Sequence, residues 1–147
     1  MFYVSGYLRC ALVFCALTVT GCFGGSAEHI ERAAVSGTVT FDGKPLPEGS
    51  IQFVPDVDST GKTIRGKAVQ AIISDGKYAL EAAQGPTVGS NKILINATQK
   101  TGKFQNFDGI KTEIQKQYIP EKYNTFSTLK FDVESVPNQA DFSLESK

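Results

Sequence analysis

Thiol and imidazole side chains, which can act as nucleophiles, general bases or transition-metal ligands, are confined to the amino end of this chain. The three cysteines are Cys10, Cys15 and Cys22, and the single histidine is His29. Zinc and copper sites are built largely from cysteine and histidine, and Ser-His-Asp triads need an imidazole. The sequence after His29 contains neither residue type. We therefore expect no such site there, and we interpret His29 as an ordinary linker residue.

Cys22 follows an apolar run that is typical of a secretory signal. Residues 10–19 carry no charge, and they provide about half of the roughly 20 apolar residues that a membrane-spanning helix needs. Val19-Thr20-Gly21-Cys22 resembles the lipobox of bacterial lipoproteins, in which an aliphatic residue and two small ones precede a cysteine. That resemblance implies cleavage before Cys22 and a diacylglyceryl group on its thiol.

This interpretation divides the chain into a lipoprotein signal peptide (residues 1–21), a lipidated flexible tether (22–34) and one domain (35–147). Two alternatives remain: an ordinary signal peptide with an incidental Cys22, or a short anchor that is not cleaved. A lipidated chain would be held at a membrane of the cell envelope, with its domain on the periplasmic or extracellular side. Phe23 stands where some proteobacterial lipoproteins carry a retention aspartate, which favours the outer over the inner membrane.

The charge of the chain argues against a nucleic-acid partner. The 15 lysines and arginines balance the 15 acids, and the two signs are interspersed. Binding to phosphate backbones depends on a basic field, which such a surface lacks. The tether has no polybasic cluster either, so lipid on Cys22 would have to supply its membrane affinity.

One acidic segment merits comparison with calcium-binding loops. Asp56, Asp58 and Gly61 match the first, third and sixth positions of an EF-hand loop. Lys67 occupies the twelfth position, where that loop requires a glutamate, and no helices are expected on either side. A solvated turn is the preferred interpretation, and a calcium site of another type stays open. We expect no cofactor.

The domain has the two-residue periodicity of β-strands rather than the period of helices. Asp42-Gly43 and Asp75-Gly76 are strong hairpin signals, and the prolines of Lys44–Pro47 disfavour a regular strand. The pattern predicts an all-β fold, an antiparallel β-sandwich of about seven strands. The expected strands are residues 35–41, 50–54, 64–74, 78–80, 92–98, 129–133 and a closing strand through Phe142 and Leu144.

A polar insertion, Gln99–Gln117, interrupts the strand pattern. Ile110, Ile114 and Tyr118 fall at helical spacing, which predicts one short helix. Phe104 and Phe107 lie in the insertion and could either close the loop or form a small contact patch.

The domain resembles a known family. The segment Val35-Ser-Gly-Thr-Val-Thr-Phe-Asp-Gly-Lys-Pro-Leu-Pro47 is similar to the opening of transthyretin-like, carboxypeptidase-regulatory-like domains, and Ser74–Leu80 to their Gly-x-Tyr hairpin. Ile119–Asn124 resembles the corresponding corner in small lipoproteins of planctomycete-type bacteria. The resemblance implies a Greek-key sandwich without activity of its own. The branch that hydrolyses 5-hydroxyisourate needs several histidines and a Tyr-Arg-Gly-Ser end, which this chain lacks.

Tyr118 and Tyr123 are the candidate ligand contacts, because tyrosine rings can stack on sugars. The alternative is a structural role at a sandwich corner, with the ring buried and the hydroxyl bonded to backbone. The leading hypothesis is a lipid-anchored, non-enzymatic accessory module that contacts an envelope protein through its edge strands or the insertion. The alternative is a carbohydrate-binding module for envelope or extracellular polysaccharide. An enzyme that uses only carboxylates, lysines or serines is a third, less favoured hypothesis.

Overall fold

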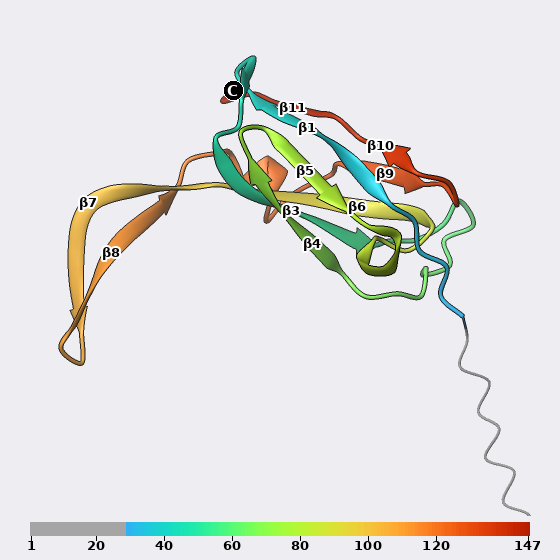
Figure 1. Ribbon diagram of the computed structural model, residues 1–147, viewed down its shortest axis with the longest axis horizontal. Helices are drawn as coiled ribbons and strands as arrows, with labels where there is room; N and C mark the ends of the chain where they lie inside the picture. Colours follow the sequence, from blue (N-terminus) through green and yellow to red (C-terminus); the bar gives the residue numbers. More distant parts are fainter. Residues whose placement is uncertain (1–28) are drawn as a thin grey trace, which may run out of the picture.

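The computed structural model describes residues 29–147, and these form an all-β, mostly antiparallel structure with a strongly curled sheet (Figure 1). Hydrogen-bonded neighbours in the main sheet follow the order β10-β1-β5-β4-β3-β6-β9, and a separate two-stranded sheet contains β7 and β8. The elements are β1 (Val35–Phe41), β2 (Lys44–Pro45), β3 (Glu48–Pro55), β4 (Val69–Ser74), β5 (Lys77–Leu80), β6 (Gly89–Asn96), β7 (Thr98–Phe107), β8 (Ile110–Gln117), β9 (Lys130–Val133), β10 (Asn138–Gln139) and β11 (Phe142–Leu144), with short 3-10 turns at Ala82–Gln84 and Glu121–Tyr123.

The centre of the sheet confirms the predicted alternation. β3 pairs antiparallel with both β4 and β6, so Ile51 lies between Ala71 and Ile95. Ile51 and Phe53 are fully buried, whereas Gln52 between them is only half-buried. Each of these strands therefore contributes one apolar face to a common core.

β1 joins the beginning of the domain to its end. It pairs antiparallel with β5 on one side and parallel with β10 and β11 on the other. Gly37 of β1 allows a close approach there, because a Cβ at this position would lie 1.9 Å from the carbonyl oxygen of Ala140. The absence of a side chain at Gly37 is thus required by packing.

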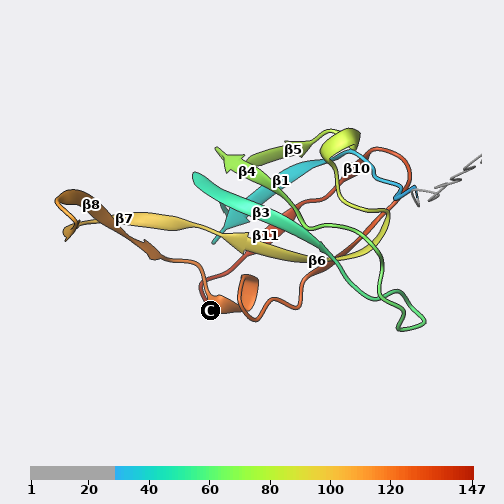
Figure 2. The ribbon, with the colours of Figure 1, turned by 90° about the horizontal axis from the view of Figure 1, so that it is seen from below.

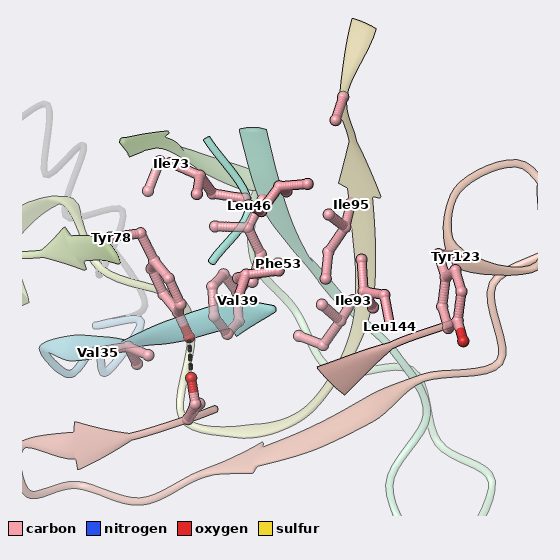
Figure 3. Packing of buried hydrophobic residues seen from close by; sticks show 14 of the residues in the cluster. Val35, Val39, Leu46, Phe53, Ile73, Tyr78, Ile93, Ile95, Tyr123 and Leu144 are labelled. Atoms are coloured by element: carbon pink, nitrogen blue, oxygen red, sulfur yellow. Dashed lines mark hydrogen bonds between the residues drawn. The ribbon is translucent and has the colours of Figure 1, made fainter. Parts of the chain in front are cut away.

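Curling of the sheet brings β9, at one end of the strand order, close to β11, which pairs with β1 near the other end. Figure 3 shows the buried apolar side chains that pack inside the curled sheet. Phe131 of β9 meets Phe142 of β11 edge to face, with ring centroids 6.4 Å apart. Tyr78 of β5 is buried, and its hydroxyl donates a 2.7 Å hydrogen bond to the Ala140 carbonyl oxygen. Burial, followed by the nearby charge of Asp141, raises the pKa of Tyr78, which keeps the hydroxyl protonated as a donor.

Two sequence-based expectations about strand boundaries were wrong. The strand expected over residues 64–74 begins only at Val69, because residues 65–68 are exposed and include Gly66, which packs tightly against the Thr87 side chain. The proline segment expected to stay irregular contains the two-residue strand β2, in which Pro45 pairs with Thr40.

The short helix expected within the Gln99–Gln117 insertion was also wrong. Ile110 and Ile114 belong to β8, which pairs with β7 on both sides of one irregular stretch, and Tyr118 follows that strand. The helical spacing of the three residues is coincidental, because every fourth residue also lies on one face of a strand. Among residues 29–147, no helix has the length and apolar character to cross a bilayer.

Candidate functional site

The most unusual feature of the molecule is the β7–β8 hairpin, residues 98–117, which we call the arm. It extends away from the rest of the described structure, which we call the body, and β7 bends sharply midway (Figure 1). Figure 2 shows from below that the arm continues one end of the body without covering either of its faces. Nearly all side chains of the arm are exposed, and the few half-buried ones include Thr101 and Ile114.

An Asp-Gly turn and an irregular middle set the geometry of the arm. Phe107 pairs with Ile110 across the turn, where Asp108 has φ 49° and Gly109 has φ 85°. Two consecutive positive φ values define a type I′ turn, whose twist matches that of the flanking strands. The register shifts between Lys100 and Phe104, and Gly102 in this stretch has φ 69°, so the ladder is interrupted near the bend.

The two faces of the distal arm differ in charge. Directly paired residues of antiparallel strands share a face, and successive residues alternate between faces. The pairs Asn106–Lys111 and Phe104–Glu113 thus define a charged face. The two pairs on the opposite face, Gln105–Thr112 and Phe107–Ile110, carry no charge, and we call this the uncharged face.

The apolar side chains on these faces are covered to different degrees. On the charged face, the Lys111 ammonium lies 4.5 Å from the centroid of the Phe104 ring, a cation–π contact that leaves Phe104 54% exposed. On the uncharged face, Phe107 is 70% exposed and Ile110 is 69% exposed. Paired apolar side chains at the end of a projecting hairpin are typical of a contact surface.

Hydrogen bonds attach the arm to the body at one end. The Gln117 side chain accepts from the Ala97 N–H at 3.2 Å, and its amide donates to the Asn96 side-chain oxygen at 3.3 Å. The Tyr118 N–H donates to the Ala97 carbonyl oxygen. These bonds hold the end of β8 against the end of β6 and fix where the arm leaves the body.

Tyr118, one of the two candidate ligand contacts, lies beside this attachment. Its ring meets Phe41 edge to face with centroids 5.8 Å apart. Both rings line an open groove of about 580 Å³ between the foot of the arm and the proline segment, together with Pro45 and Pro47. Partial burial raises the pKa of Tyr118.

Tyr123, the other candidate, occupies a different environment. Its ring is buried in the core, and its hydroxyl accepts a 2.9 Å hydrogen bond from the Glu145 N–H. Tyr123 does not line the Tyr118 groove, so the structure does not bring the two tyrosines together at one surface. Its geometry is that of a structural tyrosine tied to backbone.

The acidic segment around Asp58 forms a self-contained turn. The Asp58 carboxylate accepts hydrogen bonds from the Thr60 N–H and hydroxyl and from the Lys62 N–H, at 2.8, 2.6 and 3.0 Å. These donors, Thr60 foremost, lower the pKa of Asp58. Asp56 pairs with Lys130 at 2.7 Å, which lowers its pKa as well. Within residues 29–147 there is no group of three or more His, Cys, Asp or Glu side chains arranged to hold a metal ion.

Two residues singled out in the sequence are not part of this site. His29 is exposed at the start of the described chain, and Cys22 lies outside the described residues.

The arm itself was missed by sequence reasoning, although a signal for it exists. Asp108-Gly109 is the third Asp-Gly pair of the chain, and all three pairs adopt positive φ at both residues. An Asp-Gly pair between alternating segments is a strong local indication of a hairpin. The same criterion that located the turns at Asp42 and Asp75 would have located the tip of the arm.

Comparison with models of known protein families finds no match to this chain, and neither does a search of curated proteins.

Proposed function

We propose that the chain is an exported lipoprotein, acylated at Cys22, whose β domain is a non-enzymatic interaction module of the cell envelope. The observation that carries the interaction role is the arm, because it presents exposed apolar side chains at a distance from the core that stabilises the body. A segment of this kind contributes little to the stability of the fold. Exposed apolar patches mark interaction sites, so we infer that the arm binds another surface.

The proposed anchor rests on the apolar run before Cys22 and on the small residues that precede it. Two or more acyl chains make attachment to a membrane durable, whereas one chain alone is only marginally held. Acylation of both the thiol and the new amino group would meet that requirement. We further propose that the membrane is the outer membrane, because Phe23 rather than aspartate follows Cys22.

The non-enzymatic part of the proposal is supported by how the polar side chains of the body are used. Asp58 caps its own turn, and Asp141 accepts from the Thr38 N–H and hydroxyl at 2.7 and 2.8 Å. The buried Ser127 hydroxyl donates to the Ile93 carbonyl oxygen. Each of these groups has a structural partner that would compete with a role in acid–base or nucleophilic chemistry.

We further propose that the curled sheet is a transthyretin-like Greek-key sandwich. Supporting features are the hairpin at Asp75-Gly76, the buried Tyr78 that follows it and the corner at Tyr123, whose hydroxyl is bonded to the backbone. These positions coincide with the motifs that carry the sequence resemblance.

The anchor is tested by labelling cells with a fatty-acid analogue. Cys22→Ala should abolish incorporation of the label and release the protein to the soluble fraction when membranes are washed at high salt, which leaves acylated protein bound. Cys15→Ala is the matched control, because it removes a thiol of the proposed signal peptide and should leave labelling unchanged. Label that persists in Cys22→Ala, or a mature protein that still carries residues 1–21 in mass spectrometry, would refute the proposal.

A second candidate function, carbohydrate binding, is favoured by one observation. Tyr118, Phe41 and the prolines of residues 45–47 line a common open groove, and aromatic walls of this kind can accommodate the apolar face of a sugar ring. Binding on a glycan array that disappears with Tyr118→Ala and survives Tyr123→Phe would support this function. An array without binding would exclude it in favour of the protein or lipid contact.

A further inference from the structure

We propose that the arm lays its uncharged face on the surface of the bilayer to which Cys22 anchors the chain. This inference rests on the proposed function and specifies what the arm contacts. The arm would give the domain a second membrane attachment, separate from the lipid, and would set its orientation on the membrane.

The first argument is that the arm needs a partner. A lone two-stranded hairpin is at most marginally stable in water, and a hydrophobic face must be covered for independent stability. Phe104 is partly covered by Lys111 within the arm. Phe107 and Ile110, on the opposite face, are left exposed by the described residues. An apolar surface that receives this face would complete the structure.

The second argument is that the residue types suit a lipid interface. The arm contains four lysines, Lys100, Lys103, Lys111 and Lys116, against Asp108 and Glu113, which leaves two net positive charges in a chain that is neutral as a whole. Aromatic and aliphatic side chains enter the boundary between headgroups and acyl chains, and lysines beside them extend their stems to reach anionic headgroups. Three of the four lysines lie between the foot of the arm and its bend, and the net positive charge of the arm as a whole is complementary to anionic lipid.

The third argument is geometric. In Figure 1 the bend in β7 directs the tip of the arm downward, and the described chain begins at its lower right, so both project below the body. A plane below the body can therefore meet the tip and the start of the domain together. His29 follows Cys22 by seven positions, a distance of at most about 25 Å for a fully extended chain. An anchored Cys22 would thus keep the body close to the bilayer.

A second copy of the chain fits this face less well. Stable protein–protein interfaces usually engage about 20–30 residues on each side. The uncharged face, as its paired residues define it, offers only Gln105, Phe107, Ile110 and Thr112. A membrane has no such minimum, because each inserted side chain contributes separately and the acyl anchor supplies the high local concentration.

The decisive experiment uses the absence of tryptophan from the chain, since Phe107→Trp creates a single fluorescent reporter at the tip. The full lipidated protein is reconstituted into vesicles of phosphatidylethanolamine and phosphatidylglycerol. We expect the emission of Phe107→Trp to shift to shorter wavelengths and to be quenched by lipids brominated in their acyl chains. Phe126→Trp, 66% exposed between the 3-10 turn at Glu121–Tyr123 and β9, is the matched control and should show neither effect.

Emission of Phe107→Trp that stays water-like in the anchored protein would overturn the proposal. A shift that occurs without lipid quenching and grows with protein density would overturn it in favour of a second copy. A shift that requires added envelope protein would overturn it in favour of a protein partner.

A second measurement separates this proposal from the lipid anchor. Cys22→Ala protein, which cannot be acylated, should still sediment with anionic vesicles, and much less with phosphatidylcholine vesicles. Adding Phe107→Ser and Ile110→Ser should weaken that binding at least about tenfold, as expected for losing partial burial of two large apolar side chains. Unchanged binding would contradict the role of the arm while leaving the anchor intact. Acylation can likewise fail at Cys22 while the arm still binds vesicles.

Discussion

The body and the arm are built from the same local elements but have opposite environments. Both contain alternating strands joined by Asp-Gly turns with positive φ. In the body, one side of each central strand is covered, so that Ile51, Phe53 and Ile93 have no exposure. In the arm, the equivalent apolar positions Phe107 and Ile110 point to solvent. Alternation therefore specifies a strand, whereas the contacts of the whole fold decide whether its apolar face is buried.

The largest expected effect distinguishes buried from exposed phenylalanine. Phe53→Ala removes a fully buried ring and should lower the free energy of unfolding by about 3–5 kcal/mol. Phe107→Ala should change it by less than about 0.5 kcal/mol, because the ring has no core contacts to lose. Urea denaturation of both variants measures the difference. Similar losses for the two variants would mean that the arm is part of the cooperative core.

The next effect compares two glycines. Gly37→Ala should destabilise the domain by about 1–3 kcal/mol, since the new Cβ must displace the Ala140 backbone at the joint between β1 and β10. Gly109→Ala has open space around it but a φ of 85°, so it should loosen the tip alone. Hydrogen exchange should then accelerate in the arm while the urea midpoint stays constant. A shifted midpoint for Gly109→Ala would couple the arm to the body.

A smaller effect concerns the buried hydroxyl of the body. Tyr78→Phe removes the donor to the Ala140 carbonyl oxygen and should cost about 1 kcal/mol of stability. Tyr118→Phe, at the foot of the arm where the ring is only half-buried, should cost less. Thermal unfolding of the two variants ranks them, and the reverse order would show that the groove beside the arm is more strongly structured than its exposure indicates.

The smallest effect is a pH dependence at the joint between the ends of the domain. Hydrogen bonds from Thr38, followed by one from Gln139, lower the pKa of Asp141 below its ordinary value near 3.8. The ionised carboxylate therefore stabilises the folded state above pH 3.8, and that contribution disappears as the pH falls through the lowered pKa. Wild type should be more stable than Asp141→Asn at neutral pH, and the difference should shrink in acid. A constant difference across this range would assign the effect to something other than ionisation.

Much of the body could be predicted from sequence because its strands carry strong local signals. The inward positions of β3 and β6 follow from alternation, and two of the three Asp-Gly turns were located. The parallel pairing of β1 with β10 and β11 could not be predicted, because it joins residues such as Thr38 and Asp141, 103 positions apart. No local pattern records such a contact.

The candidate site was harder to predict than the fold. Ile110 and Ile114 satisfy both a helix and a strand period, and the cross-strand partner that decides between them lies on β7. Tyr118 and Tyr123 looked equivalent in sequence, although one lines a groove and the other fills the core. Distinguishing an exposed ring from a buried one requires the positions of distant segments such as Phe41 and Glu145.

The pairing of β1 with β11 has a consequence for how the protein is made. A chain delivered amino end first, by a ribosome or through a translocation pore, completes β1 and its neighbour β5 early. The other edge of β1 stays without its ladder partners until β10 and then β11 emerge. An unpaired strand edge recruits other chains, so the nascent domain needs protection during that interval. Synthesis of β11 thus determines when this edge of β1 is protected from pairing with other chains.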